Sequence, residues 1–254
     1  MDNPTILALD FDGVLCDGLI EYFQTAWRVY VQLWHPIEQT PPAGLAEQFY
    51  RLRPVVETGW EMPVVIRSLL QGVPEAEILL HWSEIAVAQI AADSLSAADL
   101  GAAVDRVRDE WIQADLAGWL SEHRFYPGVI DRLRELCDSP VRSLIITTKE
   151  GRFVQQLLQQ QGISLSADRI LGKEVKQPKT QSLRQIRQPN DVIWFVEDRL
   201  KTLQTITTQA DLADVRLFLA DWGYNTPDDR QTAAEDDRIE LLSIQQFCRD
   251  FSQW

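Results

Sequence analysis

Three carboxylates lie within eight residues near the start of the chain, in the segment DFDGVLCD (residues 10–17). The apolar run ILAL (residues 6–9) before them shows no helical spacing, which predicts a buried strand that opens into a charged loop. Side chains alternate along an extended segment, so Asp10 and Asp12 are expected to point the same way, while Gly13 allows a sharp turn that brings backbone amides near an anion. Two carboxylates held together are costly without a cation, so the pattern indicates a divalent metal site.

A calcium-binding loop and a solvated turn are the alternatives for this segment. A loop of the EF-hand type requires an oxygen ligand at its fifth position and a glycine at its sixth, where this chain has Val14 and Leu15. It also requires a helix rather than a strand before the loop, so the residues argue against it. A solvated acidic turn stays open for the segment taken alone.

The elements around this segment predict a parallel sheet. Short apolar runs recur over residues 141–147, 192–196 and 215–220, and stretches with helical spacing, such as residues 152–162, lie between them. Alternating buried strands and helices are typical of an α/β fold whose parallel sheet is covered on both faces. Such sheets bind ligands at the carboxyl ends of their strands, which is where residues 10–17 are expected to lie.

Residues 19–124 follow a different pattern, because apolar residues recur there at intervals of three and four. The last of these helical stripes covers residues 104–116. We therefore predict a Rossmann-like parallel-sheet core over residues 1–17 and 125–254, with an inserted all-helical domain over residues 18–124.

Composition limits the classes of function. The 254 residues are 45% hydrophobic, enough for a packed core, and the net charge of −14 disfavours binding to the phosphate backbone of nucleic acids. Three widely spaced cysteines fit neither a disulfide framework nor a paired zinc motif. No signal peptide and no apolar run long enough for a membrane span is evident, so we expect a soluble cytoplasmic protein without membrane partners, in an oligomeric state that the sequence leaves open.

The acidic segment resembles the first motif of the haloacid dehalogenase-like (HAD) hydrolase superfamily, DxDGxxxD after an apolar strand, and its residues 10, 12, 13 and 17 match that motif in full. Three further motifs of the family are a Thr or Ser ending a strand, a Lys before a helix, and an acidic group ending another strand. They match, in the family's order, Thr147 with Thr148 beside it, one of Lys173, Lys176 and Lys179, and the pair Glu197 and Asp198. The resemblance covers the predicted core, and residues 126–128 are similar to the family's point of re-entry from a helical cap.

The resemblance implies a Mg²⁺-dependent phosphatase that hydrolyses a small phosphorylated metabolite. Asp10 would attack phosphorus to form an aspartyl-phosphate, and Asp12 would donate a proton to the leaving oxygen and then activate water. Mg²⁺ would bind Asp10, the main-chain carbonyl of Asp12, and Asp198. Thr147 and Lys179 would stabilise the transferring phosphoryl group. Lys179 is chosen among the three lysines because it directly precedes a stretch with helical spacing.

The fourth motif departs from the family's commonest form. Glu197 stands where the family often has glycine, and Thr202 stands where a longer version of the motif has its last carboxylate. Which of Glu197 and Asp198 binds the metal directly therefore stays open, and we favour Asp198.

The substrate is decided outside these motifs. Arg51 and Arg53 lie in a polar and aromatic stretch of the helical insertion and are predicted to meet an anionic group of the substrate, with pairing to neighbouring Glu side chains as the alternative. Further candidates for substrate contact are Gly13, Thr148 and Glu197.

Two other functions are compatible with the same motifs. Asp12 favours phosphate esters, because dehalogenases of the family lack an acid at that place. A sugar phosphomutase similar to β-phosphoglucomutase would share both aspartates and a helical cap. A catalytically silent phosphate-binding or regulatory module could also use the fold, since fold does not dictate function.

Overall fold

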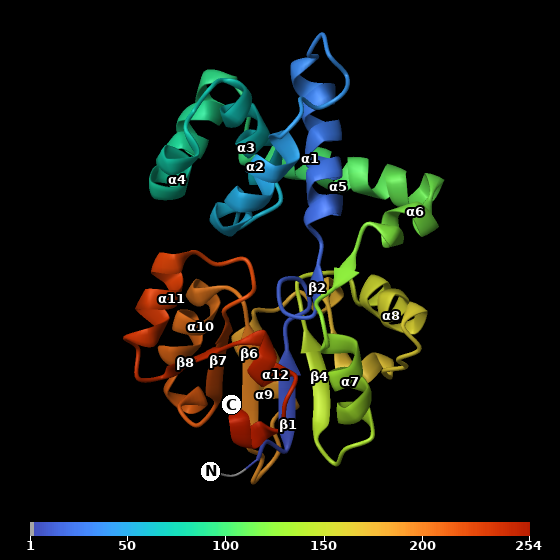
Figure 1. The fold of residues 1–254 in the computed structure, drawn as a ribbon, viewed down its shortest axis with the longest axis vertical. Coiled ribbons are helices and arrows are strands. Elements are labelled where there is room, and N and C mark those ends of the chain that lie inside the picture. The colour runs from blue at the N-terminus through green and yellow to red at the C-terminus, as the bar shows by residue number, and fades with distance from the viewer. Residues whose placement is uncertain (1–2) are drawn as a thin grey trace. The chain divides into compact units, whose positions relative to one another are not determined.

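The computed structural model describes residues 3–254, and this part of the chain divides into two compact units (Figure 1). The first, called the α/β unit below, comprises the chain up to Asp17 and from Arg124 to Trp254. The second, called the helical unit, comprises Gly18–His123. Within the described residues, no helix is both long and apolar enough to cross a lipid bilayer.

The α/β unit is built on a six-stranded sheet. Its strands are β1 (Ile6–Leu9), β4 (Arg142–Ile146), β5 (Ile170–Leu171), β6 (Ile193–Glu197), β7 (Arg216–Ala220) and β8 (Ile239–Leu242). They lie in the order β5-β4-β1-β6-β7-β8, and every neighbouring pair is parallel. The first strand of the chain is thus central, and all strands end at the same edge.

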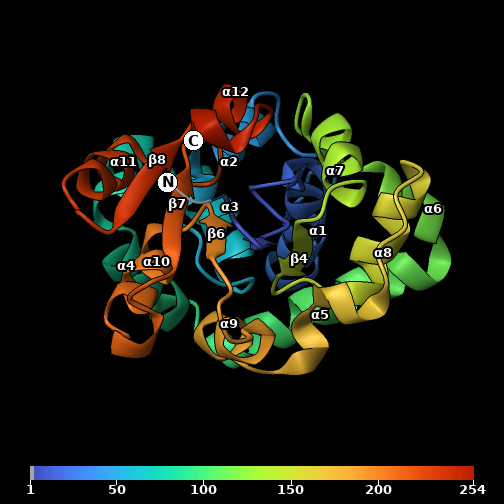
Figure 2. The same cartoon turned by 90° about the horizontal axis from the view of Figure 1, so that it is seen from below.

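Helices cover both faces of this sheet. They are α7 (Val129–Cys137), α8 (Gly151–Gln160), α9 (Lys179–Ile186), α10 (Leu200–Thr207), α11 (Pro227–Ala234) and α12 (Ile244–Phe247), with 3₁₀ turns at Ala167–Arg169, Lys173–Val175, Ala210–Leu212 and Phe251–Gln253. Figure 2 shows α9 and α10 on one side of the strands and α7 and α12 on the other. The predicted α/β class, with a parallel sheet covered on both faces, is confirmed.

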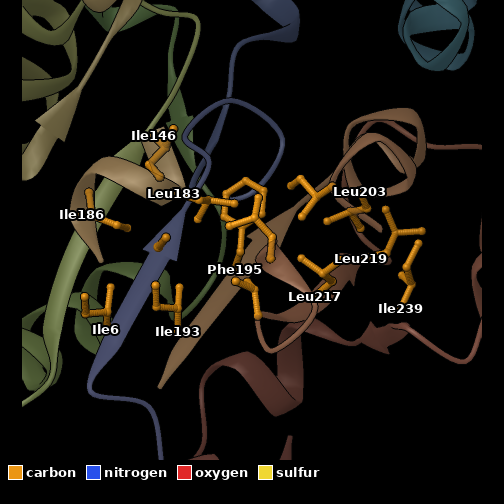
Figure 3. Close-up of a cluster of buried hydrophobic side chains, with 14 of the residues drawn as sticks. Ile6, Ile146, Leu183, Ile186, Ile193, Phe195, Leu203, Leu217, Leu219 and Ile239 are labelled. Atoms are coloured by element: carbon orange, nitrogen blue, oxygen red, sulfur yellow. The ribbon is translucent and has the colours of Figure 1, made fainter. Parts of the chain in front are cut away.

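One face of the sheet carries a cluster of buried apolar side chains, shown in Figure 3. Alternate residues of each strand face it, for example Ile193 and Phe195 of β6, because side chains alternate along a strand. Leu183 of α9 and Leu203 of α10 pack on them. The cluster fixes the positions of β1, β6 and α9, whose ends carry the residues discussed below.

The other residues of the central strands point to the opposite face, where aromatic rings gather. Trp194 of β6 contacts Phe218 of β7, with ring centroids 5.2 Å apart. The C-terminal residues Phe251 and Trp254 pack against Trp194 at 5.3 and 5.6 Å. The end of the chain therefore completes the core of the α/β unit.

The helical unit contains α1 (Leu19–Trp34), α2 (Leu45–Leu52), α3 (Glu61–Leu70), α4 (Glu75–Ala92), α5 (Ala97–Ala114) and α6 (Leu116–Ser121), with a 3₁₀ turn at Arg53–Val55. The predicted stripe over residues 104–116 is interrupted: α5 ends before Asp115, whose side chain accepts a hydrogen bond from the Gly118 amide and caps α6. Pro63 lies inside α3 but in its first turn, where a missing backbone N–H costs nothing.

Two acidic side chains stabilise the interior of the helical unit. Glu21 on α1 is fully buried and accepts hydrogen bonds from Arg108 (2.7 Å), Thr25 (2.7 Å) and Trp119 (3.1 Å). Asp93, after α4, accepts hydrogen bonds from three other side chains, those of Arg67, Gln89 and Trp34. Each carboxylate is thus surrounded by donors from several helices.

A two-stranded antiparallel ribbon marks the limits of the insertion. Its strands are β2 (Cys16–Asp17) and β3 (Arg124–Phe125), and Asp17 pairs directly with Arg124. Both strands belong to the α/β unit. The residues just before and just after the helical unit are therefore neighbours in space.

Candidate active site

Three carboxylates converge at the carboxyl edge of the sheet. β1 and β6 are neighbours with Leu9 opposite Val196, so Asp10 and the pair Glu197 and Asp198 follow at adjacent strand ends. The Asp10 amide donates to the Val196 carbonyl at 2.9 Å, which continues the pairing of the two strands. One oxygen from each of the three carboxylates lies within 4.8 Å of the others, and all three residues are buried.

Crowding and burial disfavour charge on these acids. Burial raises the pKa of Asp10 to about 7, with Lys179 opposing the shift and Glu197 adding to it. Burial, together with the neighbouring Asp198, likewise raises the pKa of Glu197 to about 7. The pKa of Asp198 is also raised, by burial and by Asp10. The group is therefore costly to ionise unless a cation is present.

Lys179 is the lysine that reaches this group. It is the first residue of α9, and its Nζ lies 2.9 Å from Asp10 Oδ1 and 2.6 Å from Glu197 Oε2. Burial lowers the pKa of Lys179, but the charges of Asp10 and Glu197 outweigh burial and raise it, so the ammonium stays charged. Lys173 and Lys176, the other two lysines of the stretch, are exposed.

Asp12 forms an ion pair with a different lysine, Lys149. Lys149 Nζ lies 3.2 Å from Asp12 Oδ1 and 3.4 Å from Oδ2, and the two side chains are 9% and 16% exposed. Residue type alone does not single out Lys149, because a lone lysine in a loop is usually solvated. Its place two residues after Thr147, the residue that matches the second motif, is the signal in the sequence that points to it.

The donor set fits a divalent cation. Asp10 Oδ1 is buried and accepts no well-directed hydrogen bond, although Lys179 lies near it. The four carboxylates of Asp10, Asp12, Glu197 and Asp198 face two lysines, so the ionised group carries two net negative charges. Buried carboxylate oxygens in that state are the ligands that Mg²⁺ prefers. Glu197 also accepts hydrogen bonds from Lys179 and from the amides of residues 198 and 199.

Thr147 lies next to this edge, directly after β4. It is buried, its amide donates to the Leu171 carbonyl, and its hydroxyl oxygen accepts a hydrogen bond from the Lys149 amide at 3.2 Å. The hydroxyl proton can therefore be donated to another group. Thr148, in contrast, is exposed.

Gly13 is required by the packing of the site. Its φ is +87°, which favours glycine, and a side chain there would collide with the carboxylate of Asp198. Its amide donates to the Cys16 carbonyl at 2.8 Å. In the structure this amide therefore closes the turn, while the sequence pattern had suggested that amides of the turn serve an anion.

A loop after β7 holds Asp198 in place, a contact that sequence reasoning missed. The Tyr224 amide donates to Asp198 Oδ2 at 2.9 Å, and the Tyr224 hydroxyl donates to Asp17 Oδ1 at 2.8 Å. Asn225 Nδ2 donates to the Asp198 carbonyl at 3.0 Å. The sequence predicts residues 220–227 only as a turn-rich loop that packs beside the site, because the contact made by the Tyr224 amide leaves no signature in residue type.

Arg51 and Arg53 lie in the helical unit. Arg51 forms a two-pronged ion pair with Glu75, with donor to acceptor distances of 2.8 and 2.7 Å. Arg53 donates to the Val56 carbonyl at 2.8 Å, and its guanidinium lies over the Tyr22 ring, 4.9 Å from the centroid.

Solved structures with a similar fold include several hydrolases. A predicted phosphatase from Clostridium acetobutylicum shares 14% identity at a TM-score of 0.60, with 97% of each chain covered. A predicted phosphoglycolate phosphatase from Haemophilus somnus shares 16% identity at a TM-score of 0.56, with 94% of this chain and 95% of that chain covered. A haloacid dehalogenase-like family hydrolase from Streptococcus pneumoniae shares 18% identity at a TM-score of 0.51, with 93% and 94% covered.

By sequence, no family model and no curated protein matches the chain. The likeness to solved structures shows that the chain has the fold of haloacid dehalogenase-like hydrolases. At the level of the fold, this confirms the resemblance carried by the four motifs.

Proposed function

We propose that the protein is a Mg²⁺-dependent phosphatase that hydrolyses the phosphate monoester of a small metabolite through an aspartyl-phosphate. One observation carries the proposal: the buried Asp10 carboxylate, within 2.9 Å of Lys179, shares the sheet edge with the paired Asp12. A nucleophile and a separate acid two residues apart are what this double displacement needs.

In the first step an Asp10 oxygen bonds to phosphorus while the bond from phosphorus to the leaving oxygen breaks. Asp12 enters this step protonated and gives its proton to that oxygen, so that an alcohol and not an alkoxide departs. The Asp12 carboxylate that is left pairs with Lys149. In the second step water attacks the same phosphorus, Asp12 takes a proton from it, and the bond between Asp10 and phosphorus breaks. Inorganic phosphate leaves, and both aspartates return to their starting states.

The charges of this chain are arranged to permit the attack of one anion on another. Lys179 neutralises Asp10 from one side, and the Thr147 hydroxyl is assigned to a phosphoryl oxygen. Asp10, Asp198 and the main-chain carbonyl of Asp12 would hold Mg²⁺, with Glu197 as a further candidate. When bound, the ion supplies positive charge to the phosphoryl oxygens.

For the substrate's remaining anionic group, Arg51 and Arg53 are both candidates. An anion that binds Arg51 must displace Glu75 from a two-pronged ion pair, which is costly. Alanine at both positions should raise KM for a substrate with a second negative charge. If every kinetic constant stayed unchanged, neither arginine would contact the substrate.

The test is release of inorganic phosphate from a panel of small phosphate esters, with Mg²⁺ and with EDTA. Asp10→Asn is the matched control, because it keeps the size of the side chain and removes the nucleophile. We expect metal-dependent turnover in the wild type and a loss of at least about 10⁴-fold in the variant, as for other nucleophile removals.

A second measurement distinguishes the covalent route. If all esters pass through one phosphorylated Asp10, added alcohol should compete with water in a ratio that is independent of the leaving group. A ratio that changes with the ester would contradict the aspartyl-phosphate. A sugar 1-phosphate that is isomerised and not hydrolysed would favour the mutase.

A further inference from the structure

Lys149 joins two neighbouring strand ends on the side of β1 away from β6. β1 pairs with β4 so that Leu9 lies opposite Ile145. Asp12 follows Leu9 by three residues and Lys149 follows Ile145 by four, so the parallel register brings the two side chains together. The register of β1 and β4 therefore places the two side chains of this ion pair next to each other.

The backbone of Lys149 is fixed on both sides. Its amide donates to the Thr147 hydroxyl at 3.2 Å, and its carbonyl accepts a hydrogen bond from the Lys173 amide at 2.9 Å. Its ammonium lies at nearly equal distances from the two Asp12 oxygens, 3.2 and 3.4 Å. A fixed backbone and a contact to both oxygens restrict the rotation of the Asp12 carboxylate.

The two lysines divide the acids between them. Lys179 contacts Asp10 and Glu197, whereas Lys149 contacts Asp12. Burying an ammonium is expensive, and lysine is almost never this well covered unless it is paired. The pairing with Asp12 offsets part of the cost of burying Lys149, and it is separate from the contact of Lys179 with Asp10.

We propose that Lys149 is a positioning residue that holds the Asp12 carboxylate where it exchanges a proton with the leaving oxygen. The inference rests on the proposed function and adds a residue that the four motifs do not include. It has a chemical signature: only a leaving group that needs a proton depends on a well-placed Asp12. An alkoxide is a strong base and needs the proton, whereas p-nitrophenolate is a stable anion and departs without it.

The experiment compares Lys149→Met with the wild type on an alkyl phosphate and on p-nitrophenyl phosphate. The constant measured is kcat/KM, which reports steps up to release of the alcohol and excludes the later attack of water. We expect kcat/KM for the alkyl ester to fall about 10²-fold, within the range for general acid catalysis. For the aryl ester we expect a change of less than about threefold, because ground-state binding is kept.

Three variants serve as controls. Lys149→Arg keeps the charge and should recover part of the alkyl activity. Lys201→Met removes an exposed positive charge and should change neither ester. In an Asp12→Asn background, Lys149→Met should have no further effect on the alkyl ester, because a positioning residue has nothing left to position.

Equal losses for both esters would overturn the inference, since they would indicate general damage to the site. So would losses that multiply independently in the double variant. A wild-type protein that hydrolyses neither ester would instead contradict the proposed function, and with it this role, which separates the two failures. Lys149→Gln repeats the comparison if the methionine variant does not fold.

Discussion

Buried carboxylates occur in both units, but their surroundings are opposite. In the helical unit Glu21 has hydrogen-bond donors from three side chains, one of them the cation of Arg108. In the α/β unit Asp10, Glu197 and Asp198 crowd one another, and burial raises the pKa of each. The helical unit uses its acids to join helices, whereas the α/β unit holds its acids in a state that a cation would relieve.

The difference shows how a buried acid indicates function. An acid that is fully supplied with donors contributes to stability, and its pKa is lowered or unremarkable. The pKa of Asp93 illustrates this: burial would raise it, but the hydrogen bonds from Arg67, Gln89 and Trp34 outweigh burial and lower it. An acid that is buried beside other acids, and whose pKa is raised, is a candidate for a catalytic or metal-binding role.

The largest loss of unfolding free energy should come from Glu21→Gln in the helical unit. The substitution leaves the Arg108 guanidinium, 23% exposed, without its carboxylate, and we expect a loss of about 3 kcal/mol of unfolding free energy, at the low end for broken buried pairs. Urea unfolding combined with peptide-resolved hydrogen exchange over α1 and α5 measures it. Glu110→Gln breaks an exposed pair, 58% and 60% exposed, and should cost less than about 0.5 kcal/mol. Similar losses of unfolding free energy for the two variants would show that the buried Glu21 contributes no more to stability than an exposed acid, which would contradict its role in joining helices.

Mg²⁺ should increase the stability of the fold, and it should do so in the α/β unit. At about 100 times its dissociation constant, a ligand bound only by the folded state stabilises it by about 2.7 kcal/mol. Hydrogen exchange should slow in β1 and β6 and stay unchanged in α1 and α5. Asp198→Asn should abolish the protection. Equal protection of both units, or protection that survives the substitution, would contradict the metal site.

The pH dependence of stability without metal should differ in sign between the units. Asp10 and Glu197 have raised pKa values of about 7, so the stability that they contribute is full below their ordinary values and is lost as the pH rises through about 7. Asp93 has a lowered pKa, so its contribution is full above its ordinary value and is lost in acid. Between pH 5 and 8 in EDTA, we expect β1 and β6 to lose about 2 kcal/mol or less of opening free energy. Asp10→Asn should flatten this slope, and an unchanged slope would assign it to other groups.

Asp93→Asn should give the smallest loss of unfolding free energy, about 1 kcal/mol. The amide oxygen can still accept one hydrogen bond, and the Asp93 side chain is 16% exposed. Urea unfolding at acid pH, combined with hydrogen exchange in α4 and at the end of α1, measures this loss of unfolding free energy. The variant should also lose the extra destabilisation of the helical unit below pH 4. A cost larger than that of Glu21→Gln would reverse the expected order.

The interior strands could be predicted from the sequence, and the edge strands could not. The runs predicted over residues 192–196 and 215–220 correspond to β6 and β7, because strands buried on both faces read as unbroken apolar segments. β5 has only two residues, and β8 is buried only at its two ends, with Glu240 and Leu241 exposed between them. Neither pattern stands out in a single sequence.

The motif residues could be found from the sequence because motifs preserve residue type at strand ends. Their partners could not be found in the same way. Lys149 acquires its contact with Asp12 from the register of β1 and β4, and Tyr224 holds Asp198 through its backbone amide. Side-chain identity alone does not encode either contact, since both depend on which strand ends are neighbours in space.

The ribbon formed by β2 and β3 has a consequence for the order of folding. The central strand β1 comes from the start of the chain, and it must pair with β4 across the whole insertion. Closing a flexible loop of about a hundred residues costs about 4 kcal/mol in chain entropy. Because Asp17 and Arg124 are paired, a helical unit that folds first presents its two ends side by side and turns that long loop into a short one. The insertion is then a template that lowers the entropic barrier to forming the sheet, and destabilising substitutions inside the helical unit should slow assembly of the α/β unit.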